Sequence, residues 1–232
     1  MKRRTPGLQA KWAYIVETLQ EIIPSYEKAS SRISLHVDRR IRPEAVKFAV
    51  QPGFLVLDLG SGPGAMSKLV VDRGGSPVLL DASRAMLKAA HSLPPSVCDN
   101  RVQGVFEYLP FRAGCFDAVV SGFALRDSAD LARAVSQVRS VLKPGGRFSF
   151  CDLGKPSSAL KSLAVACYMR VAPGLIGLLT TGRQGLKYAS LFDTYILTLN
   201  NVQLSDLMRS FFRSVSLKES QLGGSIVCEC AR

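Results

Sequence analysis

Short apolar runs alternate with segments of helical spacing through the middle of the chain. Continuous apolar runs predict buried strands, and apolar residues three and four positions apart predict helices between them. The predicted strands cover residues 54–60, 77–81, 101–106, 116–122 and 146–154. The predicted helices cover residues 63–73, 83–91 and 128–142. Such alternation is typical of βαβ units, so the pattern predicts an α/β fold with a parallel sheet buried on both faces.

The two ends of the chain have different patterns. Residues 8–23 have an amphipathic helical pattern, and a second helical pattern continues to about residue 50. Residues 157–213 are mostly helical in pattern, and two final strands are joined by a turn at Gly223 and Gly224. We therefore predict one domain in four parts. These are an N-terminal helical cap (1–50), a ligand-binding core (51–156), a helical lid or insertion (157–213) and a final strand pair (214–232).

The chain is strongly basic. It has 30 Lys and Arg residues against 18 Asp and Glu residues, a formal net charge of +12 and a pI near 9.7. Its hydrophobic content of 47% is ordinary for a folded protein. The charge favours an anionic partner, either nucleic acid or an anionic membrane surface. A solvated basic surface without a partner is the alternative.

Two segments concentrate the positive charge. Residues 1–16 contain no acid, and neither does the stretch between Asp152 and Asp193. The second stretch includes VAPGLIGLLT, which we expect to be too short and too interrupted by Pro and Gly to span a bilayer. No apolar signal-peptide core follows the basic N-terminus, so we do not expect secretion.

The six cysteines are scattered, without the paired spacing of a zinc site or a redox motif. They lie at positions 98, 115, 151, 167, 228 and 230. We expect them to be buried free thiols in a reducing compartment. Cys167 lies within a helical apolar pattern and is expected in the core.

A glycine-rich loop follows the first predicted strand. Asp58 ends the apolar run, and glycines at alternate positions (60, 62 and 64) lead into a helical pattern. Glycine lets a ligand approach main-chain N–H groups closely. The loop reads GSGPG, which is neither a P-loop nor a GxGxxG dinucleotide loop. Asp81 ends the next strand, where a carboxylate can accept both hydroxyls of an adenosine ribose. A turn followed by a helix-capping Asp is the alternative.

Four segments carry a more specific signal. They read VLDLGSGPG, LLDASRAML, EYLPFRAGCFDAVVSGFALRD and VLKPGGRFSFCDLGKP. In this order and spacing they resemble the class I S-adenosylmethionine-dependent methyltransferases, and among these the UbiE-like ubiquinone/menaquinone biosynthesis C-methyltransferases. The segment YEKASSRISLHVDRRIR resembles the N-terminal part of that family. The resemblance implies a Rossmann-like, seven-stranded, mostly parallel sheet with N-terminal helices and a helical insertion before the last strand pair.

The resemblance also implies S-adenosylmethionine as the cofactor. Its expected binding residues are Asp58, Gly60, Ser61, Gly62, Gly64, Asp81, Ala82, Met86, Val105, Phe106 and Ser121. Val105 replaces the Asp with which the family meets the adenine amino group. We therefore expect the adenine to rely on main-chain N–H groups near Phe106 and on packing by Met86. Asp127 stands where the family usually has Asn, and the family's His after the C-terminal Gly-Gly pair is missing.

Ligands of open parallel sheets bind beyond the carboxyl ends of the strands, where Arg126, Asp127 and Asp152 are expected. Ring-carbon methylation needs an ionised or hydrogen-bonded neighbouring hydroxyl. We assign the Arg126–Asp127 pair to this work, with Arg126 stabilising the developing phenolate and Asp152 as a second candidate proton acceptor. A simple ion pair or a helix cap is the alternative.

Four residues are candidates for binding the methyl acceptor: Tyr26, His36, Phe123 and Tyr188. Packing is the alternative role for both tyrosines.

The resemblance implies methyl transfer to a ring carbon of a demethylmenaquinol- or ubiquinol-type polyprenyl quinol. Another small-molecule acceptor, an RNA acceptor and a non-enzymatic S-adenosylmethionine-binding protein are the alternatives. The fourth strand lacks the Asn/Asp-Pro-Pro-aromatic motif of enzymes that methylate base amino groups, which disfavours nucleic acid. We expect a cytoplasmic enzyme with peripheral contact to an anionic membrane, and a homodimer is an open alternative. The chemistry requires no metal.

Overall fold

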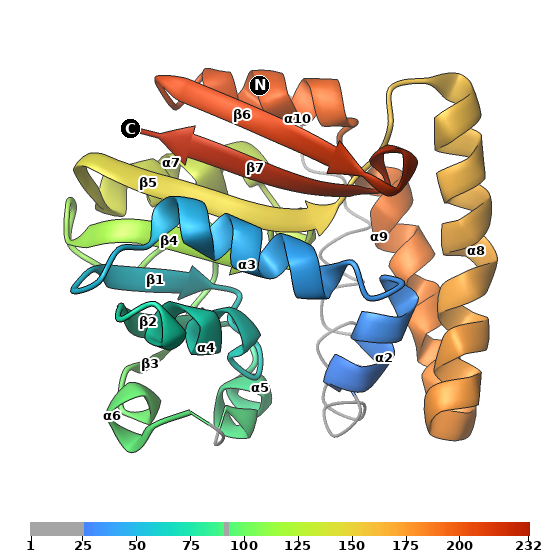
Figure 1. The fold of residues 1–232 in the computed structure, drawn as a ribbon, viewed down its shortest axis with the longest axis horizontal. Coiled ribbons are helices and arrows are strands. Elements are labelled where there is room, and N and C mark those ends of the chain that lie inside the picture. The colour runs from blue at the N-terminus through green and yellow to red at the C-terminus, as the bar shows by residue number, and fades with distance from the viewer. Residues whose placement is uncertain (1–25, 91–92) are drawn as a thin grey trace.

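The computed structural model describes residues 26–90 and 93–232 (Figure 1). Within them, seven strands form one sheet in the order β3-β2-β1-β4-β5-β7-β6. The strands are β1 (Leu55–Leu59), β2 (Ser76–Asp81), β3 (Arg101–Gln103), β4 (Phe116–Gly122), β5 (Leu142–Leu153), β6 (Ser214–Ser220) and β7 (Ser225–Ala231). Strands β1 to β5 run parallel, whereas β7 is antiparallel to both β5 and β6. The predicted seven-stranded, mostly parallel sheet is therefore confirmed.

Helices cover both faces of this sheet. They are α2 (Tyr26–Ile33), α3 (Asp38–Ala49), α4 (Ala65–Asp72), α5 (Arg84–Ala89), α6 (Pro95–Cys98), α7 (Leu131–Val141), α8 (Ala159–Thr181), α9 (Leu191–Leu197) and α10 (Asn201–Arg209). Helices α3 and α4 pack on one face, and α7 and α10 pack on the other. The helix expected over residues 8–23 lies outside the described residues.

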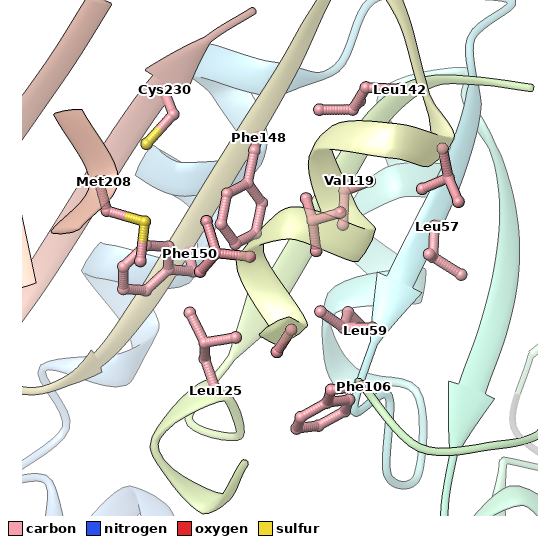
Figure 2. Packing of buried hydrophobic residues seen from close by; sticks show 14 of the residues in the cluster. Leu57, Leu59, Phe106, Val119, Leu125, Leu142, Phe148, Phe150, Met208 and Cys230 are labelled. Atoms are coloured by element: carbon pink, nitrogen blue, oxygen red, sulfur yellow. The ribbon is translucent and has the colours of Figure 1, made fainter. Parts of the chain in front are cut away.

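Alternating side chains of each strand enter two separate cores. Val56 and Val120 pack against α3, whereas Leu57 and Val119, their neighbours in the chain, pack toward α7. This alternation follows from the two-residue period of a strand. Figure 2 shows the core on the α7 side, where the rings of Phe148 and Phe150 are stacked with centroids 5.2 Å apart. Both faces are buried, as the continuous apolar runs predict.

Helix α8 corrects one expectation about the insertion. Pro173 and Gly177 lie inside a continuous helix of 23 residues and do not interrupt it. Gly177 allows the backbone of Gly185 to pack directly against the helix, because a Cβ there would collide with the Gly185 carbonyl. By length and composition, the helical region 159–197 could cross a membrane, and 28% of its most apolar window is buried within the described structure.

The helical insertion lies beyond the carboxyl ends of the parallel strands. Figure 1 shows α2, α8 and α9 together at this end of the sheet. Tyr168 of α8 donates a hydrogen bond to the Ile33 carbonyl of α2 over 2.7 Å. Cys167, expected in the core, is exposed on the outer side of α8, because the inner side of the helix presents Val165 and Met169 instead. The insertion therefore covers the strand ends that position the candidate site.

Candidate active site

The glycine loop between β1 and α4 is held against the end of β2. The N–H groups of Gly60 and Ser61 both donate to the Leu80 carbonyl, at 2.8 and 3.0 Å. Gly60, Gly62 and Gly64 all have positive φ values, of 72°, 54° and 93°. A Cβ on Gly62 would have no neighbour within 4 Å, since this glycine faces an open cavity. The loop thus exposes main-chain groups to a ligand, as its sequence predicts.

Asp81, at the end of β2, ties the loop to the next helix. Its Oδ2 accepts a hydrogen bond from Gly62 N over 2.9 Å, and its Oδ1 accepts one from Ser83 N over 2.8 Å. Burial raises the pKa of Asp81, and the two backbone donors oppose this effect. The carboxylate keeps lone pairs for further donors and lines the cavity, so it can accept ribose hydroxyls.

Asp58 lies beneath the loop and is fully buried. Its Oδ2 accepts a short hydrogen bond from Ser67 Oγ, at 2.6 Å. Burial raises its pKa to about 6, and the Ser67 hydrogen bond opposes this shift. Asp58 Oδ1 and the buried Ser61 Oγ have no hydrogen-bond partner among the described residues. Buried polar atoms without a partner are costly. Ser61 lines the adjacent cavity whereas Asp58 does not, so the Ser61 hydroxyl fits a ligand that carries polar groups, such as the amino acid end of S-adenosylmethionine.

A cavity of about 730 Å³ opens in front of the loop. Among the expected cofactor residues, its lining includes Gly60, Ser61, Gly62, Asp81, Ala82, Met86 and Phe106. Val105 is exposed and does not line the cavity, and the Ser121 hydroxyl is buried and donates to the Leu59 carbonyl. Ser121 therefore supports β1 from below the site.

The segment after β4 brings three candidate catalytic residues together. Arg126 Nη1 lies 2.5 Å from Asp152 Oδ1 and also donates to the Phe123 carbonyl at 2.6 Å. Arg126 Nε lies 3.7 Å from Asp127 Oδ1. Arg126 and Asp152 form a buried ion pair, with side chains 8% and 4% exposed. The alternative of an ion pair is thus present, but Asp152 rather than Asp127 is the closer partner.

Asp127 lines the cavity in front of the glycine loop, whereas Arg126 and Asp152 do not. We call this first cavity the cofactor-side cavity. Burial raises its pKa to about 6, and the Arg126 guanidinium opposes this shift. A carboxyl group that titrates near neutral pH and faces a cavity is a candidate general base.

A second cavity, of about 390 Å³, adjoins the same segment. The 3₁₀ turn η2 (Leu125–Asp127), β5, α7, α9 and α10 contribute to its walls. Arg126 and Asp152 line only this second cavity, whereas Asp127 lines both. Of the three residues expected from the sequence, Asp127 therefore lies between the two cavities.

The expected acceptor residues are not all brought to the cavities. Phe123 lines the first cavity, with a positive φ of 61°. His36 is exposed and Tyr188 is buried against α2, and neither lines either cavity. The side chain of Tyr26 lies outside the described residues.

Arg42 of α3 is a cavity residue to which the sequence analysis gave no role. Its guanidinium lies 4.8 Å from the centre of the Phe123 ring and lines the first cavity. It also opposes the raised pKa of Asp58. The basic segment over residues 39–42 is visible in the sequence, but only the packing of α3 shows that Arg39 and Arg42 line the cavity whereas Arg40 does not.

Within the described parts of the chain, no three His, Cys, Asp or Glu side chains gather in a group that could hold a metal ion.

Known proteins resemble this chain in sequence and in fold. Residues 57–150 match a family model described as a methyltransferase domain. An uncharacterized methyltransferase of Synechocystis is 34% identical, over 72% of this chain and 74% of that protein. A demethylmenaquinone methyltransferase of Clavibacter sepedonicus is 29% identical over 78% and 75%. A 2-phytyl-1,4-naphtoquinone methyltransferase of Synechococcus elongatus is 33% identical over 60% and 64%.

Solved structures with the same fold are more distant in sequence. An S-adenosylmethionine-dependent methyltransferase from Thermotoga maritima, described as a possible histamine N-methyltransferase, has a TM-score of 0.62 and 17% identity. That match covers 93% of this chain and 98% of the other. A similar protein from Methanococcus maripaludis has a TM-score of 0.60 and 17% identity, over 92% and 93%. These matches show the fold.

Proposed function

The chain belongs to the class I S-adenosylmethionine-dependent methyltransferases, and we propose that it methylates a ring carbon of a reduced polyprenyl quinone. Relatives named for demethylmenaquinone and for 2-phytyl-1,4-naphtoquinone support this acceptor class. The observation that carries the proposal is the position of Asp127, a carboxyl group that borders both cavities. One cavity would hold the cofactor, and the other would lie next to the acceptor.

Asp127 is the proton acceptor in this proposal. S-adenosylmethionine supplies a methyl group that its sulfonium already activates, so the protein mainly orients the reactants and excludes water. An aromatic carbon becomes more nucleophilic when a neighbouring hydroxyl loses its proton. Asp127, with a pKa raised to about 6, can take that proton near neutral pH. After methyl transfer, the methylated carbon gives up its ring proton to solvent water, and the ketone oxygen takes back the proton that Asp127 holds, so the aromatic quinol is restored without a redox change.

Arg126 receives a different role from the one expected from the sequence. Its guanidinium is engaged by Asp152 and by the Phe123 carbonyl. We therefore assign Arg126 and Asp152 as positioning residues that hold the turn after β4, so that Asp127 faces the first cavity. Desolvation of this turn keeps the pKa of Asp127 high.

Peripheral binding to an anionic membrane forms part of the proposal. Helix α8 carries exposed apolar side chains along its length, and the most exposed of these, Leu160, is 81% exposed. This exposed stripe consists of Leu160, Leu163, Val171, Leu175 and Leu179. Lys161 and Arg170 flank the stripe, and the sequence has no acid between Asp152 and Asp193. A second copy of the same face would bring cations against cations. An anionic lipid surface complements both the apolar stripe and the charge, and it is the place where a lipophilic acceptor is found.

The acceptor class can be tested with one incubation. The protein is mixed with methyl-labelled S-adenosylmethionine, a dithionite-reduced lipid extract that lacks the final quinone methylation, and bulk tRNA. Label in the organic phase that depends on the reductant supports the proposal. Label in the nucleic acid, or in neither phase, contradicts it.

A further inference from the structure

The cavity beside η2 has mostly apolar walls. Its aliphatic and aromatic lining consists of Leu125, Leu131, Phe150, Leu153, Leu197, Leu199, Leu204 and Leu207. Its volume of about 390 Å³ lies within the range of about 300–1,000 Å³ that is usual for small-molecule sites. No residue of the glycine loop (residues 60–64) lines this second cavity, and residues 60–63 line the first cavity instead. A second, apolar ligand group therefore fits this space better than the cofactor does.

Polar residues line this cavity on two sides. Thr194 and Thr198 line it at α9, where their hydroxyls already donate to the Leu191 and Tyr195 carbonyls, and a group of four polar residues lines it at η2 and the end of β5. Arg126, Asp127, Ser128 and Asp152 all line it. The Ser128 hydroxyl is buried and has no hydrogen-bond partner among the described residues. The Ser128 hydroxyl could bind the polar end of a ligand whose apolar body contacts the apolar walls of the cavity. Asp127 connects that polar end with the cofactor-side cavity.

The α9 side of the cavity has apolar residues that reach the surface. Leu197 and Leu199 line the cavity and are 47% and 38% exposed. Ile196, next to them in α9, is also exposed. An apolar chain longer than the cavity could therefore leave it along these leucines at its rim, next to the Lys155 ammonium, which donates to the Ile196 and Thr198 carbonyls.

We propose that this cavity binds the apolar chain of the methyl acceptor, with the acceptor ring at the Asp127 end. The proposal rests on the proposed function and adds the location of the chain. Ser128 and Asp127 meet the oxygen atoms of the ring, and the leucines of α9 and α10 contact the chain. The cavity therefore favours acceptors whose chain is long enough to fill it over acceptors with a shorter chain.

Narrowing the cavity tests this location. Ala132 lines the cavity at an exposed position of α7, so Ala132→Phe adds bulk with little effect on the core. Ser136, one turn later on α7, is exposed and outside the cavity, so Ser136→Phe is the matched control. Leu199→Trp at the rim is the second variant, in case Ala132→Phe does not fold. Thermal unfolding and S-adenosylmethionine binding establish that each variant is intact.

The measurement is kcat and KM for a short-chain and a long-chain quinol of the same ring. For Ala132→Phe we expect KM for the long-chain quinol to rise roughly tenfold, the effect of losing contact with about two methylene groups. KM for the short-chain quinol and both kcat values stay unchanged. Equal effects on both quinols, or no effect on either, would contradict binding of the chain in this cavity and would leave the proposed function standing. If the unaltered protein methylates neither quinol, the proposed function itself fails.

Discussion

The carboxylate of Asp152 binds Arg126 twice, through the backbone N–H at 3.1 Å and through guanidinium Nη1 at 2.5 Å. This pair fixes the turn after β4 from the end of β5. Asp127, the next residue, lines the cofactor-side cavity, which neither Arg126 nor Asp152 does. In our proposal Asp127 therefore accepts the proton, and Arg126 and Asp152 position it.

Asp127→Asn tests proton acceptance. The substitution preserves shape and removes the base, so kcat should fall by about 10²–10⁴, the usual contribution of general base catalysis. In the unaltered enzyme, activity should be lost as pH falls through about 6, because Asp127 must be ionised to accept a proton. The pH–rate profile of the variant should lack this limb. An unchanged limb near pH 6 in Asp127→Asn would assign the titration to another group.

Gly62→Ala tests whether the loop meets the cofactor. The left-handed φ of Gly62 should cost about 1–2 kcal/mol of stability on substitution. A Cβ there points into the cavity, so the affinity for S-adenosylmethionine should fall at least roughly tenfold when close backbone approach is lost.

Gly145→Ala is the matched control for this measurement. Gly145 also has a positive φ, of 76°, and open space at its Cβ position, but it lies outside the first cavity. Calorimetry should show lost affinity for Gly62→Ala alone. Equal affinities of the two variants would place the cofactor elsewhere.

Arg126→Met tests the buried ion pair. Removal of the guanidinium leaves the Asp152 charge buried without its partner, which should lower the free energy of unfolding by about 3–5 kcal/mol. The double variant Arg126→Met/Asp152→Leu should recover part of this loss, because it removes the unpaired charge. Urea unfolding measures both. A single variant as stable as the parent would show that the pair does not hold the turn.

Charge removal on the helical insertion tests the membrane contact. Four basic residues there are replaced by Gln: Lys161, Arg170, Arg183 and Lys187. Each should contribute about 1 kcal/mol to binding of vesicles that contain phosphatidylglycerol, an effect lost at high salt. The matched control replaces four exposed basic residues elsewhere: Lys47, Arg112, Arg139 and Arg213. Equal loss of vesicle binding in both variants would show that binding depends on the net charge of the protein and not on the helical insertion.

The sheet could be predicted because its signals are local. The apolar run over residues 116–122 coincides with β4, and the alternate glycines mark the loop before α4. The helical character of the insertion was expected from its apolar spacing, but Pro173 and the glycines were expected to interrupt its apolar segment, because proline and glycine usually end helices. Here Gly177 and Gly185 pack backbone against backbone because neither residue has a Cβ, and the helix continues through Pro173.

The site could be predicted only in part, because long-range packing decides which side chains face a cavity. The places of Asp81 and Asp127 at the edge of the first cavity could be predicted from their positions after strands. The pairing of Arg126 with Asp152 depends on the register of β4 beside β5, which no local pattern gives. The second cavity joins residues from 125 to 207, so it follows only from the folded arrangement of the insertion.

The position of the transferred methyl group tests the proposed chemistry most directly. The purified protein would convert a reduced demethylmenaquinone with methyl-labelled S-adenosylmethionine, and the product would be reoxidised in air and analysed by NMR. We predict a methyl group on a ring carbon of a product that reoxidises to a quinone. A methyl ether that resists reoxidation, or the absence of any methylated quinone, would contradict ring-carbon methylation by this enzyme.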